Sequence, residues 1–311
     1  MLRPATALCI GLALALAGCG GDDGGDSKKA RGLDARLFDT AADDVYAGPA
    51  GVYALDSSEL TRIDGDGDAD GSPIGVAATQ PRVAIGNDAA WVTDVTEHDA
   101  KRVDLATGDR QVLDMGAVEP VWVAASDDRA WISSGPELVP FTDDGQPGSP
   151  VTLPCSISEL VFGNGAVWGG CEQGVVRVDA DTGEAQLIDV GGEPDALAAT
   201  ESALWALVGD RLVSISAAGD VAVEVAAPGN ATSIAGAGTS LWVTADREGD
   251  DQPERVTRHD ATTGRRVDGP IALPGGTDDV AAASASIAAD GDSLWFALAF
   301  YGGPLGTVAR V

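Results

Sequence analysis

A six-residue segment with an aromatic residue at its third position recurs seven times along the chain. Five of the intervals between successive aromatic residues are 37 to 40 residues long, and the last one is 53. Six of the seven tryptophans occupy this position, and Trp122 is the exception. The aromatic positions are Tyr53, Trp91, Trp131, Trp168, Trp205, Trp242 and Trp295. A repeat of this length indicates supersecondary units that bury their apolar faces against one another.

Each repeat contains four short segments typical of strands. A small-residue segment such as 81–88 (PRVAIGND) precedes the aromatic one, and a third such as 174–179 (GVVRVD) follows it. A turn then leads to a fourth segment such as 184–191 (EAQLIDVG). No segment shows a sustained helical period. The pattern therefore predicts an all-β, seven-bladed β-propeller over residues 34–311, with the aromatic side chains packed between blades.

The two ends of this region predict how the ring closes. The last repeat ends after its third strand, at 306–311 (GTVARV), and a spare strand precedes the first repeat, at 35–40 (ARLFDT). We expect the spare N-terminal strand to complete the last blade. This 3+1 pairing of N-terminal and C-terminal strands would leave the ring without an open edge.

Residues 177–208 carry a more specific pattern. There D-x-x-T-G is followed by V-G-x-x-P, a small-residue strand and an aromatic strand, and residues 102–125 repeat the pattern. It resembles the YVTN-type and virginiamycin B lyase-like propeller repeat. The lyase relatives use His and Glu near the axis with a divalent metal. Because neither His98 nor His259 aligns with that pattern, we transfer no catalytic residue.

The first 33 residues differ from the rest. Residues 1–18 combine Arg3 with an apolar run too short to span a bilayer, and end before Cys19. This resembles a bacterial lipoprotein signal peptide, which implies cleavage before Cys19 and its lipidation; the alternative is an ordinary secretory signal. The Gly- and Asp-rich segment that follows predicts a flexible tether up to residue 33. We expect a lipid-anchored protein on the extracytoplasmic side of the cell membrane.

The chain is strongly acidic. Its 49 Asp and Glu outnumber its 19 Lys and Arg, for a formal net charge of −30. This charge argues against nucleic acid as a partner, because a phosphate backbone would be repelled. The partners that we expect are the membrane, through the lipid anchor, and a protein or small-molecule ligand. We expect a monomer.

The stretch 62–73 (RIDGDGDADGSP) raises the question of a metal site. Its four Asp residues are Asp64, Asp66, Asp68 and Asp70. Counted from Asp66, the ninth and twelfth positions of a calcium loop are Ile74 and Ala77, which supply no carboxylate. A lengthened Asx turn is the favoured interpretation, and a weak calcium site is the alternative.

Two cysteines remain after the signal and lipidation positions, Cys155 and Cys171. Their midpoint falls in the turn at 163–165, so an antiparallel hairpin centred there places them opposite each other. In an oxidising export compartment this predicts a disulfide.

One end of the predicted propeller gathers the connections between blades and the turns between second and third strands. The long insertion at 245–254 and the Gly-rich 300–306 fall there. Its candidate binding residues are Arg82, His98, Glu119, Glu193, Asp195, Asp278, Asp279 and Tyr301. Merely solvated loops are the alternative. His259, in a third strand, is expected to be a surface residue.

The favoured function is a binding or assembly module that uses this acidic face. The alternative is a metal-dependent lyase or hydrolase with Ca²⁺ or Mg²⁺ as cofactor, using Glu119, Glu193, His98 or the pair Asp278–Asp279. A propeller that holds a small molecule or a quinone cofactor is a third interpretation.

Overall fold

The computed structural model describes residues 36–116, 119–245, 255–272, 282–291, 293–300 and 307–311. The chain divides into two compact units, Met1–Gly32 and Leu33–Val311, and all the described residues belong to the second. Cys19, Asp278, Asp279 and Tyr301 lie outside the described residues. No helix within these ranges is long and apolar enough to cross a membrane.

The described strands form seven four-stranded antiparallel sheets. Three sheets contain β2(Asp44–Gly48), β3(Gly51–Asp56), β4(Glu59–Ile63) and β5(Ile74–Gly75); β6(Pro81–Ile85), β7(Ala89–Asp94), β8(Asp99–Asp104) and β9(Arg110–Val112); and β10(Trp122–Ala125), β11(Arg129–Ser134), β12(Glu137–Thr142) and β13(Val151–Thr152). Three more contain β14(Glu159–Gly163), β15(Ala166–Cys171), β16(Gly174–Asp179) and β17(Ala185–Ile188); β18(Ala196–Ala199), β19(Leu204–Val208), β20(Arg211–Ile215) and β21(Val221–Ala226); and β22(Ala231–Ala237), β23(Ser240–Ala245), β24(Arg255–Asp260) and β25(Arg266–Ala272). In these six sheets the strands follow chain order.

The remaining sheet joins the two ends of the unit. Its order is β1(Arg36–Ala41), β28(Thr307–Arg310), β27(Ser293–Phe300) and β26(Ala282–Asp290). Strand β1 pairs antiparallel with β28, with Arg36 opposite Arg310. The first described strand is therefore the outer strand of the last sheet.

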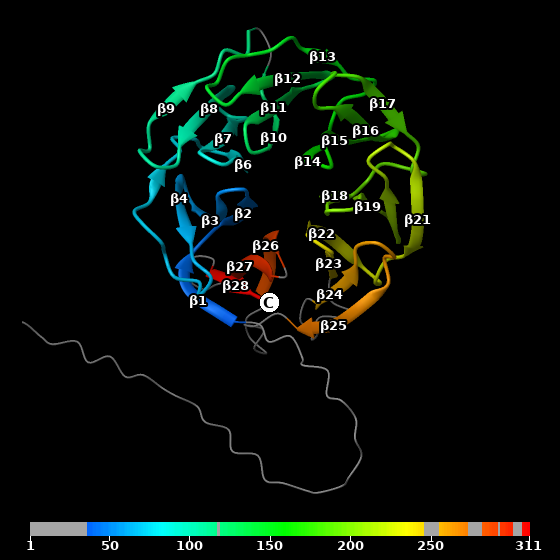
Figure 1. Ribbon diagram of the computed structural model, residues 1–311. Helices are drawn as coiled ribbons and strands as arrows, with labels where there is room; N and C mark the ends of the chain where they lie inside the picture. Colours follow the sequence, from blue (N-terminus) through cyan, green and yellow to red (C-terminus); the bar gives the residue numbers. More distant parts are fainter. Residues whose placement is uncertain (1–35, 117–118, 246–254, 273–281, 292, 301–306) are drawn as a thin grey trace, which may run out of the picture. The chain divides into compact units, whose positions relative to one another are not determined.

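The first strands of the sheets contact one another in a closed circle. Going round, β2 is followed by β6, β10, β14, β18, β22 and β26, and β26 contacts β2 again. Figure 1 shows these strands around the centre, with the fourth strands at the rim. Strands make up all the regular structure of the described ranges. The prediction of an all-β propeller is confirmed.

The seven aromatic positions all lie in the second strand of a sheet and pack against the sheet that follows. None is more than 4% exposed. Trp131 stacks on Phe162 of β14, with ring centroids 5.0 Å apart. The ring centroids of Trp91 and Phe141 of β12 are 6.3 Å apart. Trp295 closes the circle, since it packs with residues of β2, β3 and β4. The aromatic side chains thus fill the spaces between sheets, as the sequence predicts.

Cys155 and Cys171 form the predicted disulfide, with their Cα atoms 6.3 Å apart. Cys171 ends β15, and Cys155 lies in the connection that leads into β14. The bond ties the entry of this sheet to its second strand, within the apolar cluster that contains Trp131.

The expectation that His259 is a surface residue is wrong. Its side chain is 4% exposed. Its ring nitrogens contact the Oγ1 of Thr257 at 3.0 Å and the carbonyl oxygen of Gly264 at 2.9 Å. Burial lowers the pKa of this histidine below its usual value. Strand β24 buries side chains on both of its faces, Val256 on one and Thr257 and His259 on the other.

Candidate functional site

We call the loop face the end of the propeller formed by the connections that enter each sheet and the turns between second and third strands. Arg82 is the second residue of β6 and lies at this end, and Glu193 and Asp195 lie in the connection before β18. His98 lies in the turn after β7, and Glu119 in the connection before β10. Predicted residues that the structure describes therefore come from four separate segments of this face.

Two of them meet. His98 Nδ1 lies 3.7 Å from Glu119 Oε2, and both side chains are largely exposed. The contact joins two neighbouring sheets. In water it is a weak interaction, because solvent screens both groups.

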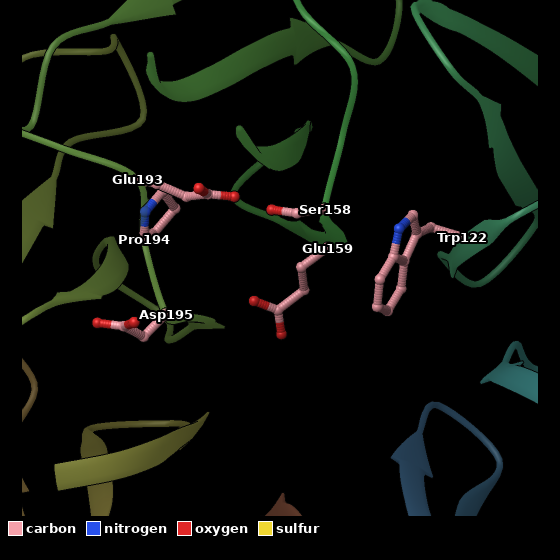
Figure 2. A pocket seen from close by; sticks show the side chains of 6 residues that line it. All are labelled: Trp122, Ser158, Glu159, Glu193, Pro194 and Asp195. Carbon is pink, nitrogen blue, oxygen red and sulfur yellow. The ribbon is translucent and has the colours of Figure 1, made fainter. Parts of the chain in front are cut away.

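A pocket of about 440 Å³ opens on the loop face beside the first strands. Its lining combines an aromatic ring with three carboxyl groups and comes from three sheets: Trp122, Ser158, Glu159, Glu193, Pro194 and Asp195. We call it the axial pocket. Figure 2 shows the Glu159 carboxyl group between the Trp122 ring and the 194–195 segment.

Glu159 lines this pocket and was not among the predicted site residues; the same holds for Trp122 and Ser158. Glu159 begins β14, and one carboxylate oxygen, Oε2, accepts a hydrogen bond of 2.7 Å from the Leu197 amide. Burial raises its pKa to about 7, and the amide opposes that shift. The available signal was a charged residue in a first strand, where the repeats mostly place small or apolar residues.

Trp122 stands at the entry of β10 and holds an arginine. The guanidinium carbon of Arg82 lies 3.2 Å from the centroid of the Trp122 ring. Among the described residues Arg82 Nη1 has no hydrogen-bond partner although it is buried, and burial lowers the pKa of this arginine. The signal here was plain, because Trp122 is the one tryptophan outside the repeated position.

Arg82 also lines a second pocket of about 400 Å³ on the loop face, together with Asp44 and Gln80. Nearby, burial and Asp44 raise the pKa of Tyr46 far above its usual value. Arg82 thus separates two hollows, with Trp122 on one side and the entry of β2 on the other.

The carboxylate of Asp195 and the hydroxyl of Ser158 in the axial pocket both form hydrogen bonds with the backbone. Asp195 Oδ2 accepts a hydrogen bond of 2.8 Å from the Gly209 amide, and Ser158 Oγ donates one of 3.1 Å to the Gly170 carbonyl. Glu193 is exposed. The pocket therefore has a fixed frame and one carboxylate, Glu193, at its open rim.

The Asp-rich turn lies at the opposite end of the propeller. Asp64 Oδ1 accepts hydrogen bonds from the amides of Asp66 at 2.9 Å and Asp68 at 3.0 Å, and Asp70 pairs with Arg62 at 3.2 Å. Among the residues with described positions, no three His, Cys, Asp or Glu side chains are grouped closely enough to hold a metal ion. The geometry favours the Asx-turn interpretation, and the calcium site stays an untested prediction.

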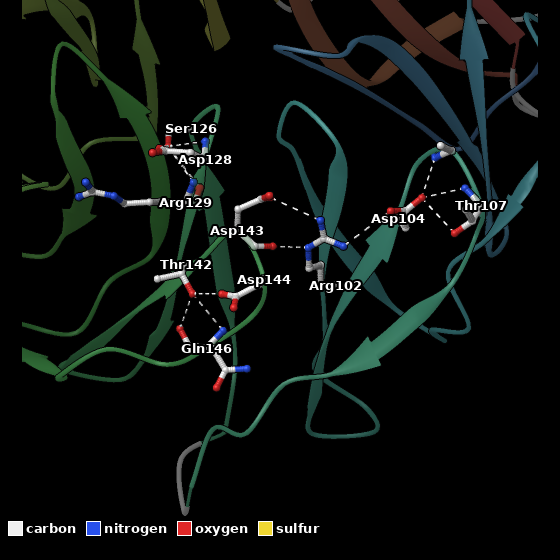
Figure 3. A network of polar contacts seen from close by, with 11 residues as sticks. Arg102, Asp104, Thr107, Ser126, Asp128, Arg129, Thr142, Asp143, Asp144 and Gln146 are labelled. Carbon is white, nitrogen blue, oxygen red and sulfur yellow. Dashed lines mark hydrogen bonds and ion pairs between the residues drawn. The ribbon is translucent and has the colours of Figure 1, made fainter.

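The same turn chemistry recurs in other sheets. Asp104 Oδ1 accepts from the amides of Ala106 and Thr107 and from the Thr107 hydroxyl, which lowers the pKa of Asp104. Figure 3 shows this turn beside Arg102, whose guanidinium reaches the backbone carbonyl and the carboxylate of Asp143 in the next sheet. These polar contacts stabilise the turns and hold neighbouring sheets together, and they need no ligand to account for them.

Comparisons with known proteins identify the fold alone. No protein-family model matches the sequence, and no curated protein matches it. Among solved structures, the chain is similar to "Structure of U3-55K" with a TM-score of 0.66 and 9% identity, over 89% of this chain and 98% of that one. It is also similar to "Crystal structure of RRP9 WD40 repeats" (0.65, 10%, 89% and 96%) and to "Crystal Structure of Mitotic Checkpoint Complex" (0.64, 11%, 93% and 97%). At these identities the likeness shows the β-propeller fold and nothing beyond it.

Proposed function

We propose that the chain is a lipid-anchored, seven-bladed β-propeller with 3+1 closure, which acts as a binding or assembly module outside the cytoplasmic membrane. Its ligand docks on the loop face. The observation that carries this proposal is the axial pocket, which combines an aromatic wall with a partly buried carboxyl group. Concave sites of this size with a few convergent polar groups are typical of ligand binding.

One further observation supports a binding role, and another supports the type of repeat. One of the similar solved structures is described as a checkpoint complex, so a propeller of this shape takes part in an assembly there. The repeated Asp turns, including those at Asp104, Asp179 and Asp260, support placing the repeats with the YVTN type. A rigid ring that presents variable connections at one end suits recognition of a partner.

The binding proposal is tested by cross-linking in intact cells that express the chain, followed by purification. The Glu193→Lys variant reverses one charge at the rim of the axial pocket. The matched control is Glu184→Lys, an exposed glutamate in the turn between β16 and β17 at the opposite end. We expect the partners of the native chain to be lost with Glu193→Lys and retained with Glu184→Lys. Retention of all partners by both variants would contradict a role of this face.

The lipid anchor has its own test. Cys19→Ser removes the proposed lipidation site, whereas Cys9→Ser alters a cysteine within the signal segment. We expect Cys19→Ser to release the chain from the membrane fraction and Cys9→Ser to leave it there. A Cys19→Ser protein that still sediments with membranes would disprove the anchor.

The contact between His98 and Glu119 favours a second candidate, a metal-dependent lyase or hydrolase. Both groups are exposed and lie side by side, as two metal ligands would. Purified protein would be assayed with magnesium on cyclic depsipeptides and other lactones. Turnover that EDTA abolishes would support this candidate over the binding module.

A further inference from the structure

The axial pocket offers one polar group that its surroundings leave without charge compensation. Glu159 Oε2 is engaged by the Leu197 amide, and the influences on its pKa are burial and that amide. None of the six lining residues is a lysine, arginine or histidine. Ionising Glu159 therefore places a negative charge in a partly dehydrated site that contains two further carboxylates.

The wall opposite this carboxyl group is an aromatic ring held in place from behind. Arg82 stacks on the Trp122 ring but lines the other pocket, so the ring is fixed and part of it still borders the axial pocket. A tryptophan ring attracts cations through its electron-rich face. The carboxyl group and the indole, on the two sides of one hollow, favour the same charge.

The size of the site distinguishes between kinds of cation. Within the part of the chain that the structure describes, no three His, Cys, Asp or Glu side chains are grouped closely enough to hold a metal ion, and this includes the three carboxyl groups of the pocket. The pocket of about 440 Å³ has room for a carbon chain beside the indole. A small inorganic ion would not find three such ligands here, whereas an organic cation can reach both the carboxylate and the ring.

We propose that the axial pocket binds an organic cation, an alkylammonium or alkylguanidinium group, which lies against the Trp122 ring and pairs with the Glu159 carboxylate. The inference rests on the proposed function, since it specifies the chemistry that the loop face recognises. The group belongs either to a lysine or arginine side chain of a partner protein or to a free amine. The net charge of −30 on the chain attracts both kinds of cation to the protein as a whole.

Binding of such a group competes with a proton on Glu159. The charged groups around it are Glu193 and Asp195 from the connection before β18, and Arg82 on the far side of Trp122. Glu193 and Asp195 are exposed, whereas burial raises the pKa of Glu159 to about 7, so the Glu159 carboxyl group changes its charge near neutral pH. With a pKa of about 7, one-site proton competition weakens cation binding about tenfold between pH 8 and pH 6.

The test uses the full chain labelled with 5-fluorotryptophan and followed by ¹⁹F NMR. The resonance of Trp122 is assigned by its loss in Trp122→Phe. Butylammonium and butylguanidinium are titrated as probes, with butyramide as the neutral control, and a short peptide with one arginine represents a partner side chain. We expect the Trp122 signal to shift with the cations and not with butyramide.

Two glutamate variants make the result specific. Glu159→Gln keeps an oxygen to accept from Leu197 and removes the charge, so we expect at least a tenfold loss of affinity and no dependence on pH. Glu201→Gln is the matched control, an exposed glutamate between β18 and β19 at the opposite end, and should bind as the native chain does. Equal binding of butyramide, or unchanged affinity in Glu159→Gln, would overturn the proposal.

The outcomes also distinguish a partner side chain from a free amine, and they test the cation pocket separately from the binding module. Binding of the peptide far above that of the free amines indicates a partner side chain, whereas similar binding indicates a free amine. If no probe shifts Trp122 but Glu193→Lys still abolishes partner capture, the cation pocket is wrong and the binding module stands. If the cations bind but partner capture is insensitive to Glu193→Lys, the protein-partner form of the proposed function fails.

Discussion

Arg177 lies beside the Trp168 ring of its own sheet and forms a hydrogen bond with the next sheet. Its guanidinium carbon lies 5.7 Å from the centroid of the Trp168 ring, directly across the β15–β16 pair, and its Nε donates a hydrogen bond of 2.7 Å to the Ala217 carbonyl. Arg102 beside Trp91 and Arg310 beside Trp295 repeat the arrangement and reach carbonyl oxygens of Asp143 and Gly65. The aromatic residue and the arginine opposite it thus act together at several sheet boundaries.

Removing one aromatic residue should open one of these boundaries. Trp168 is fully buried, so Trp168→Ala leaves a cavity between two sheets and should lower the free energy of unfolding by about 3–5 kcal/mol. Urea denaturation measures the change. The control is Val112→Ala, whose side chain is 67% exposed and should change stability by about 0.5 kcal/mol or less. Equal effects of the two changes would contradict packing between sheets.

Glu159 should destabilise the protein above neutral pH. Its folded pKa of about 7 exceeds its ordinary value of 4.5, so the folded state binds the proton more tightly than the unfolded state does. Its favourable contribution is complete below about pH 4.5 and is lost as the pH rises through 7. Glu159→Gln should therefore be more stable than the native chain at pH 8, by up to about 3 kcal/mol, and match it in acid.

Urea unfolding at pH 5 and pH 8 would measure this difference. Glu201→Gln, at the opposite end, should follow the native chain at both pH values. A Glu159→Gln protein no more stable than the native chain at pH 8 would show that the carboxyl group is better solvated than its position indicates.

The Asp turns should contribute to stability with the opposite dependence on pH. The hydrogen bond from the Thr182 amide contributes most to the lowered pKa of Asp179, and the hydrogen bond from the Thr182 hydroxyl lowers it further. A lowered folded pKa gives stability that is present above the ordinary pKa of about 4 and is lost as the pH falls through the folded value. We expect Asp179→Ala to flatten the acid limb of the stability curve. An unchanged acid limb in thermal melts would contradict this role.

Reduction of the disulfide should lower stability. The bond closes a loop with a sequence separation of 16, for which the loss of unfolded-state entropy corresponds to about 3 kcal/mol. Native protein should melt at a lower temperature with dithiothreitol. The Cys155→Ala/Cys171→Ala variant should melt low with or without it, and a reductant effect on that variant would point to another cause.

Calcium should leave the melting temperature unchanged. The Asp64 carboxylate already accepts the amides of its own turn, and Asp70 pairs with Arg62. Thermal melts with millimolar calcium and with EDTA provide the comparison. A rise with calcium that Asp66→Asn and Asp68→Asn abolish would establish the weak site instead.

The repeated architecture was predictable because its signals are local. An aromatic residue in each second strand and an Asp at the end of several third strands recur within single units, so each unit can be recognised without knowing its neighbours. The disulfide was predictable for the same reason, since Cys155 and Cys171 belong to one hairpin region. His259 was misplaced because burial on a strand depends on the adjacent sheet.

The sequence by itself determined the all-β class, the repeat and the end of the propeller on which to look for a site. The tertiary structure decided the site. Arg82, Trp122, Glu159 and Glu193 come from successive repeats and carry no common motif, and their meeting depends on the curvature that brings the first strands together around one axis. The raised pKa of Glu159 likewise follows from its burial by these neighbours, which no linear pattern encodes.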